Sequence, residues 1–170
     1  MQAIAVVGTK KSGKTTTIEN LTRELTKRGY KVAAIKHINE PNFTVDTPGK
    51  DTWRYQQAGA KTIVAMGPNQ TVTIEKTTTP LTALLEKCQS NDITFIEGFK
   101  KTVAQNKTIP KIAVTKNKTE AENALKTYKP IIAFTGPFNT ITLNPNIPYA
   151  NAQANPQKLA DTIEKALLKK

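Results

Sequence analysis

The chain has 170 residues, of which 25 are Lys or Arg and 13 are Asp or Glu, giving a formal net charge of +12. With 38% hydrophobic and 22% charged residues, the composition is that of a globular protein and excludes a disordered one. The longest apolar runs are far shorter than the roughly 18 residues that span a bilayer, and residues 1–8 do not resemble a leader peptide. The single cysteine, Cys88, excludes an internal disulfide. We therefore expect one cytoplasmic domain over residues 1–170 that does not use a membrane.

The positive charge is spread evenly along the chain. Residues 1–85 carry 12 basic and 6 acidic groups, and residues 86–170 carry 13 and 7, so each half is +6. Aromatic residues, which would stack on bases, make up only 6% of the chain. The charge predicts a surface that favours anionic ligands, and it gives no reason to expect a nucleic acid as partner.

The first forty residues predict a βαβ unit. A short apolar run at residues 4–7 ends at a glycine and is typical of a buried strand. From Gly13 onward, apolar residues recur at spacings of three and four, which predicts a helix that ends at Gly29. Residues 31–36 predict the next buried strand, so the two strands belong to a parallel sheet.

Further strands are predicted along the rest of the chain, at residues 62–66, 71–74, 93–96, 111–115 and 131–134. A helix is predicted to begin at Pro80, and a closing helix to begin with Asn155 as its cap and Pro156 at its first position. This order of elements predicts an α/β fold with three layers, in which helices cover both faces of a mostly parallel central sheet.

A phosphate-binding motif stands between the first strand and the first helix. Residues 8–15 read GTKKSGKT and match G-x-x-x-x-G-K-[ST] at every fixed position. Such a loop turns its amides toward a polyphosphate, while Lys14 reaches the β and γ phosphates and Thr15 ligates Mg²⁺. The motif predicts a P-loop NTPase fold in which these residues bind the nucleotide: Gly8, Lys10, Lys11, Ser12, Gly13, Lys14, Thr15 and Thr16.

Glu97 is the predicted acidic partner of this loop. It follows the apolar strand at residues 93–96 and precedes Gly98, the position of a residue that manages Mg²⁺ or water in a P-loop site. A carboxylate turned to solvent at the strand end is the alternative.

The segment after the second strand supplies more candidates, because loops at the carboxyl ends of parallel strands gather around a ligand. Asp46 and Asp51 are candidate contacts for Mg²⁺ or water, and Lys36, Lys50 and Arg54 are candidate contacts for anions. His37 is the only histidine, so a zinc site is not expected. A hydrogen-bonded strand end and a substrate contact both remain open for this histidine.

One segment resembles a motif that reads the nucleotide base. Residues 117–120 read NKTE, close to the N-K-x-D guanine motif of GTPases. An acidic side chain there could accept hydrogen bonds from guanine, which hints at GTP. In a chain rich in Lys and Asn, coincidence explains the match equally well.

Together these segments resemble the MobB family, whose members serve the biosynthesis of molybdopterin guanine dinucleotide. The resemblance rests on residues 8–15, 35–37, 46–52, 57–60 and 95–100, which lie in register over more than half of the chain. It implies a GTP-binding protein with weak GTPase activity, a guanylyltransferase as partner, and a homodimer.

The resemblance also implies a role for each candidate residue. Lys14 and Thr15 hold phosphates and Mg²⁺, while Asp46 and Glu97 complete the metal and water site. Four further residues face an anionic pterin or the γ-phosphate: Lys36, His37, Lys50 and Asp51.

Two other functions remain open from the sequence. A small-molecule kinase would use the same loop, but such enzymes clamp phosphates with several arginines and this chain has three. The second is an adaptor whose bound nucleotide is structural and is not significantly hydrolysed.

Overall fold

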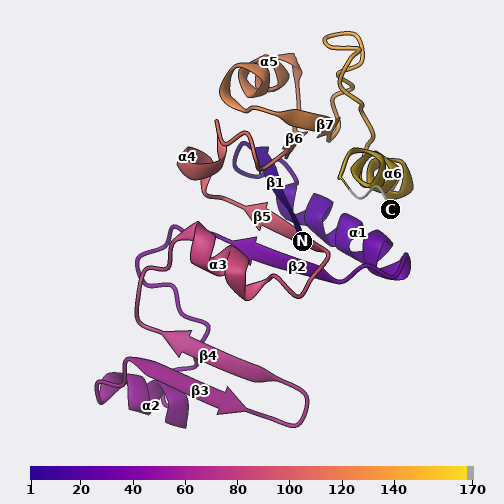
Figure 1. Ribbon diagram of the computed structural model, residues 1–170. Helices are drawn as coiled ribbons and strands as arrows, with labels where there is room; N and C mark the ends of the chain where they lie inside the picture. The colour runs from indigo at the N-terminus through magenta and orange to yellow at the C-terminus, as the bar shows by residue number, and fades with distance from the viewer. Residues whose placement is uncertain (168–170) are drawn as a thin grey trace. The chain divides into compact units, whose positions relative to one another are not determined.

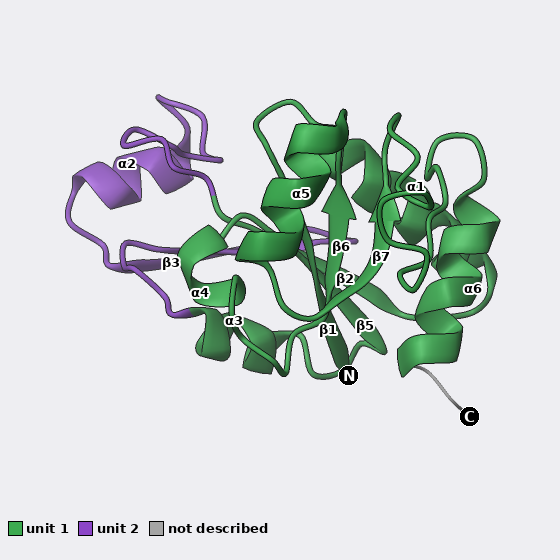
Figure 2. Cartoon of the chain, turned by 90° about the horizontal axis from the view of Figure 1, so that it is seen from above, with its two compact units in different colours: residues 1–37, 81–170 green, residues 38–80 purple. Residues whose placement is uncertain are grey.

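The computed structural model describes residues 1–167, and the chain divides into two compact units (Figure 2). Unit 1 is Met1–His37 together with Leu81–Lys170, and unit 2 is Ile38–Pro80. Among the described residues no helix is both long enough and apolar enough to cross a membrane.

Unit 1 is built on a parallel sheet. Within the described residues its five strands lie in the order β2-β5-β1-β6-β7 (Figure 1). Their bounds are Gln2–Gly8 for β1, Val32–Lys36 for β2, Ile93–Glu97 for β5, Lys111–Val114 for β6 and Ile131–Thr135 for β7. The strand β5, which carries Glu97, therefore lies between β1 and β2, although β2 directly follows β1 among the strands in chain order.

Helices cover both faces of this sheet, which confirms the three-layer α/β fold. The helices α1 (Lys14–Lys27) and α6 (Pro156–Leu167) pack on one face. The other face is covered by α3 (Leu81–Lys87), α4 (Lys100–Val103) and α5 (Lys118–Thr127) (Figure 1). In β1, Ile4 and Val6 face the first layer while Ala5 and Val7 face the second. A strand buried on both faces needs a continuous apolar run, and this is why residues 4–7 show no alternation.

Local signals in the sequence set the ends of two helices. After α1, Gly29 adopts a φ of 89°, and the amide of Tyr30 donates to the carbonyl of Leu25, so the glycine ends the helix as predicted. At the start of α6, the side chain of Asn155 accepts a hydrogen bond from the amide of Lys158 at 3.0 Å. The predicted cap and the first helical position at Pro156 are both confirmed.

Unit 2 contains a helix and an antiparallel hairpin. The helix α2 (Asp51–Gln57) contacts β3 (Thr62–Met66), which pairs with β4 (Thr71–Glu75). The sequence predicted both strands, whereas it left the α2 segment as part of a loop. Whether the two units behave as one domain, as the sequence predicted, stays a prediction.

Candidate nucleotide site

The loop at residues 8–13 joins β1 to α1 and is shaped by close backbone packing. A Cβ on Gly8 would lie 2.5 Å from the carbonyl oxygen of Val114 and 2.7 Å from the hydroxyl of Ser12. Lys11 adopts a φ of 58°, in the left-handed region that residues other than glycine seldom adopt. A glycine at position 8 and a strained loop are what a backbone cradle for a phosphate requires.

The N-terminus of α1 carries no side-chain cap. Its N-cap residue, Gly13, has a φ of 99°, makes no side-chain hydrogen bond, and no acidic residue stands in the first helical turn. The first amides of a helix have no partner within the helix, and the helix dipole favours an anion there. The amides of Lys14, Thr15 and Thr16 are thus left available to a phosphate.

Lys14 is folded back over the loop. Its ammonium nitrogen donates to the carbonyl oxygen of Thr9 at 2.6 Å. Burial lowers the pKa of Lys14, and the nearby Lys100 and Lys36 lower it further, while Glu97 opposes this shift. This partly desolvated ammonium makes no ion pair within residues 1–167, and a phosphate would supply an anionic partner.

Thr15 and Glu97 lie in direct contact beside the loop. The hydroxyl of Thr15 lies 3.1 and 3.0 Å from the two carboxylate oxygens of Glu97. The ammonium of Lys36 lies 3.4 Å from the same hydroxyl and 3.5 Å from the carboxylate. The structure thus brings together four sequence-predicted residues, Lys14, Thr15, Lys36 and Glu97, from three elements of unit 1.

The chemistry of this cluster fits a magnesium ion. Hydroxyl and carboxylate oxygens are ligands that Mg²⁺ uses beside the phosphates of a bound nucleotide. Thr15 and Glu97 present one of each, and a cationic group already lies against both. The residues that would hold the ion are therefore Thr15 and Glu97.

The family model for molybdopterin guanine dinucleotide synthesis protein B (MobB) matches residues 3–136, most of the chain. The chain belongs to the MobB family. The match includes the phosphate loop, Lys36, the segment at residues 46–52 and Glu97, so the candidate site lies within it.

Relatives and solved structures agree with this assignment. A putative molybdopterin-guanine dinucleotide biosynthesis adapter protein of Methanocaldococcus jannaschii is 39% identical over 120 residues, covering 69% of this chain and 49% of that protein. The adapter protein of Haemophilus influenzae is 33% identical over 113 residues, covering 64% of this chain and 60% of the relative. The chain thus aligns with only about half of the first relative's length. The crystal structure of Bacillus subtilis MobB superimposes with a TM-score of 0.77 at 27% identity, covering 97% of each chain.

In this MobB-family chain the backbone after β5 is strained next to His37. Gly98 and Phe99 adopt φ values of 91° and 50°, and a Cβ on Gly98 would lie 2.8 Å from the Cβ of His37. The amide of His37 donates to the carbonyl of Glu97, and its ring lies 4.9 Å from the ring of Phe99. The packing favours the interpretation of His37 as a hydrogen-bonded strand end, and a further contact with substrate stays a prediction.

The other three predicted residues, Asp46, Lys50 and Asp51, belong to unit 2. Residues 47–50 form a turn in which Pro48 occupies the second position, Gly49 has a φ of 85°, and the amide of Lys50 donates to the carbonyl of Thr47. One carboxylate oxygen of Asp46 accepts from the amide of Thr47 and from the hydroxyl of Thr52, and the other is buried without a hydrogen bond among the described residues. Their part in the phosphate site of unit 1 stays a prediction.

The segment that resembled a guanine motif begins α5. Asn117 is the N-cap of this helix, and its side chain accepts from the amide of Glu120 at 2.9 Å. The carboxylate of Glu120 accepts from the hydroxyl of Thr9 at 3.0 Å and from the amide of Lys116 at 2.9 Å. Both side chains are therefore engaged in the fold, and the sequence did not predict the bond that ties Glu120 to the phosphate loop.

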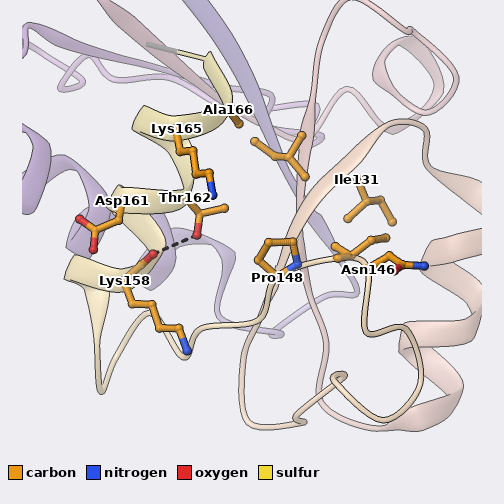
Figure 3. A pocket seen from close by; sticks show the side chains of 10 residues that line it. Ile131, Asn146, Pro148, Lys158, Asp161, Thr162, Lys165 and Ala166 are labelled. Carbon is orange, nitrogen blue, oxygen red and sulfur yellow. Dashed lines mark hydrogen bonds between the residues drawn. The ribbon is translucent and has the colours of Figure 1, made fainter. Parts of the chain in front are cut away.

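A sizeable cavity of unit 1 lies away from this site. It measures about 590 Å³ and lies between the amino end of β7, the segment at residues 146–148 and α6 (Figure 3). Its lining includes Ile131, Pro148 and Lys158. In a parallel sheet the amino ends of the strands lie opposite the edge where β1 enters the phosphate loop. This cavity therefore lies at the opposite end of the sheet from the phosphate loop.

Proposed function

We propose that the chain is a GTP-binding adapter in the biosynthesis of molybdopterin guanine dinucleotide, with weak, magnesium-dependent GTPase activity. The observation that carries the proposal is the uncapped N-terminus of α1 beside the contact between Thr15 and Glu97. The names of the curated relatives support the pathway, because they are described as adapter proteins for this cofactor. The resemblance of the sequence to the MobB family supplies GTP as the nucleotide.

In this proposal each group of the site has a separate task. The loop amides and Lys14 bind and orient the phosphates. Bound Mg²⁺ would contribute charge neutralisation at the phosphates. Glu97 holds the hydroxyl of Thr15 in place and orients water. We assign Asp46, Lys50, Asp51 and His37 to the phosphate, water or pterin side of the ligand. Since no arginine contacts the Thr15–Glu97 pair among the described residues, slow turnover is expected.

The proposed partner is the guanylyltransferase that attaches GMP to molybdopterin, and the proposed assembly is a homodimer. An adapter needs to bind its nucleotide and its partner at the same time. Addition of the chain with GTP to the purified transferase is expected to raise the rate of dinucleotide formation. An equal rate with and without the chain would contradict the adapter role while leaving nucleotide binding intact.

Nucleotide binding is tested by thermal denaturation with GTP, ATP or GDP, with and without Mg²⁺. A ligand that binds only the native state raises the apparent Tm, by mass action. We expect the largest increase with GTP and Mg²⁺. An increase with ATP and none with GTP would contradict the base assignment.

The variant Lys14→Ala is the specific probe of the loop. It removes the ammonium that Thr9 holds over the loop, so the increase with GTP is expected to disappear. Lys27→Ala, at the exposed end of the same helix, is the matched control and is expected to keep the full increase. Unchanged affinity for labelled GTP in Lys14→Ala would refute the site. Transfer of labelled phosphate to an acceptor other than water would favour the kinase alternative.

A further inference from the structure

Sheet register places a lysine at the metal position of the candidate site. In the pairing of β2 with β5, Lys36 lies opposite Glu97, and each is the last residue of its strand. The Lys36 ammonium lies 3.4 Å from the Thr15 hydroxyl and 3.5 Å from a carboxylate oxygen of Glu97. These two groups are the same pair that the site offers to Mg²⁺.

Glu97 requires a cation at this place. Its side chain is only 13% exposed, and a carboxylate removed from water is costly unless a positive charge or hydrogen-bond donors compensate it. The Thr15 hydroxyl supplies one donor, and Lys36 supplies the positive charge. The Lys36 side chain is itself 50% exposed, so it is free to swing into solvent when another cation arrives.

We propose that Lys36 occupies the position of the divalent cation in the ligand-free protein and excludes that cation until a polyphosphate binds. The proposal rests on the proposed function, because it takes Thr15 and Glu97 as the metal-binding pair. A polyphosphate changes the balance of charge: it attracts both the ammonium and the metal, so Lys36 moves from Glu97 to phosphate oxygens and the metal takes its place.

The charges around the site support this exclusion. Lys14 interacts with Lys36, Lys100 and the two carboxylates Glu97 and Glu120, and Glu120 is also paired with the ammonium of Lys116 at 3.3 Å, so ammonium groups outnumber carboxylates in this cluster. A divalent cation added to this set without phosphate meets net repulsion, which acts over a few ångströms in a partly buried site. Loss of Lys36 leaves Glu97 without its cation and makes the same position attractive to a metal.

The test is a titration with Mn²⁺ alone, in which the electron paramagnetic resonance signal of free Mn²⁺ is followed without nucleotide. The variant Lys36→Met keeps the aliphatic stem and removes the charge, and it is expected to bind Mn²⁺ about 10-fold or more tightly than the unmodified protein. Lys36→Gln is the second variant, because it keeps a hydrogen-bond donor for Glu97 if the methionine disturbs the fold. Affinities within twofold of the unmodified protein in both variants would overturn the proposal.

Lys100→Met is the matched control. It removes the same charge near Lys14, but no hydrogen bond or ion pair joins Lys100 to Thr15 or Glu97 within the described residues. We expect its affinity for Mn²⁺ to stay within about threefold of the unmodified protein. An increase in Lys100→Met as large as in Lys36→Met would attribute the effect to general charge, and the proposal would be wrong.

A second readout uses GTP. The ratio of its Kd in EDTA to its Kd in Mg²⁺ is expected to rise at least about fivefold in Lys36→Met, because the variant has lost the cation that replaces the metal. An unchanged ratio would count against the proposal. If neither protein binds any nucleotide, the proposed function fails, while the Mn²⁺ titration still decides the position of Lys36.

Discussion

Two helices begin at the same edge of the central sheet, and their N-termini are built in opposite ways. The helix α1 follows β1 and has a glycine N-cap, no side-chain cap and no acid in its first turn. The helix α5 follows β6, the neighbour of β1, and is capped by Asn117 with Glu120 in its first turn. The first amides of α5, its closed end, are thus partly satisfied by the chain itself, whereas no side chain within residues 1–167 caps the first amides of α1, its open end.

Under the proposed function, the open end of α1 binds the ligand and the closed end of α5 is structural. A carboxylate in the first turn occupies the place that a phosphate would take and neutralises the helix dipole there. Glu120 does more, because it also accepts from Thr9 and so fixes one side of the phosphate loop. The closed end of α5 thereby supports the open end of α1, and each can be altered separately.

The largest effect is expected from Gly8→Ala, which disrupts the phosphate loop that leads into the open end of α1. The new methyl group would lie 2.5 Å from the Val114 carbonyl oxygen, so β6 or the loop must move. We expect a loss of about 3 kcal/mol in the free energy of unfolding, measured by urea denaturation, together with loss of GTP binding.

Gly29→Ala is the control for Gly8→Ala. Gly29 also has a positive φ, 89°, but a Cβ there meets nothing within 4 Å. It measures the cost of backbone conformation alone, about 1 kcal/mol. Equal losses in the two variants would show that Gly8 is not held by close packing.

The sequence predicted the open end better than the closed one, for a physical reason. A phosphate loop is a local pattern, and its glycines, lysine and threonine are adjacent in the chain. The match of residues 117–120 to a guanine motif was ambiguous, because Asn and Glu are also the residue types that cap helices. Only the contacts of Asn117 and Glu120 distinguish the two uses.

The order of the strands in the sheet could not be predicted from the sequence, for a different reason. Apolar runs indicate strands but not their neighbours, so nothing in residues 32–36 showed that β5 would lie beside them. The contact of Lys36 with Glu97 follows from that pairing and could not be predicted without it. The separate unit formed by Ile38–Pro80 was likewise hidden, because its helix α2 has no buried residue and a weak apolar pattern.

The next effect in size is expected from Glu120→Gln, which weakens the closed end. Burial raises the pKa of Glu120, but the bonds from the Lys116 amide, the Thr9 hydroxyl and the Lys116 ammonium together outweigh it and hold this pKa below its usual value of 4.5. A carboxyl group with a lowered pKa in the folded state stabilises the protein above its unfolded pKa, and this stabilisation is lost as the pH falls through the folded pKa.

We therefore expect Glu120→Gln to cost about 2 kcal/mol at pH 7 and progressively less below pH 4.5, since the protonated acid resembles glutamine. Urea denaturation at a series of pH values measures this. Glu122→Gln, whose more exposed carboxylate lies 3.8 Å from Lys118, is the control and is expected to cost little at any pH. A constant difference between Glu120→Gln and the unmodified protein down to pH 3 would contradict the assigned bonds.

Asn117→Ala tests whether this residue caps a helix or reads a base. Loss of the bond to the Glu120 amide is expected to cost about 1 kcal/mol of stability, with no change in the preference for GTP over ATP. Asn155→Ala, which removes the equivalent cap of α6, is expected to cost the same. A change in nucleotide preference in Asn117→Ala, and not in Asn155→Ala, would instead support the interpretation of residues 117–120 as a guanine motif.

The smallest change in stability is expected from Thr16→Glu, which gives α1 the kind of first turn that α5 already has. Thr16 is the third residue of α1, where a carboxylate interacts favourably with the unpaired amides and the dipole. The variant is expected to gain about 0.5 kcal/mol in the free energy of unfolding and to bind GTP at least about 10-fold more weakly, because the new carboxylate repels phosphate. Thr119→Glu, in the first turn of α5, is the matched control and is expected to leave the Kd for GTP unchanged.

Most substitutions that weaken the binding of a ligand also destabilise the fold. A variant that is more stable yet binds GTP less tightly would therefore be specific evidence that the open end of α1 is kept free for an anion. Unchanged GTP affinity in Thr16→Glu would show instead that the phosphates do not approach this helix.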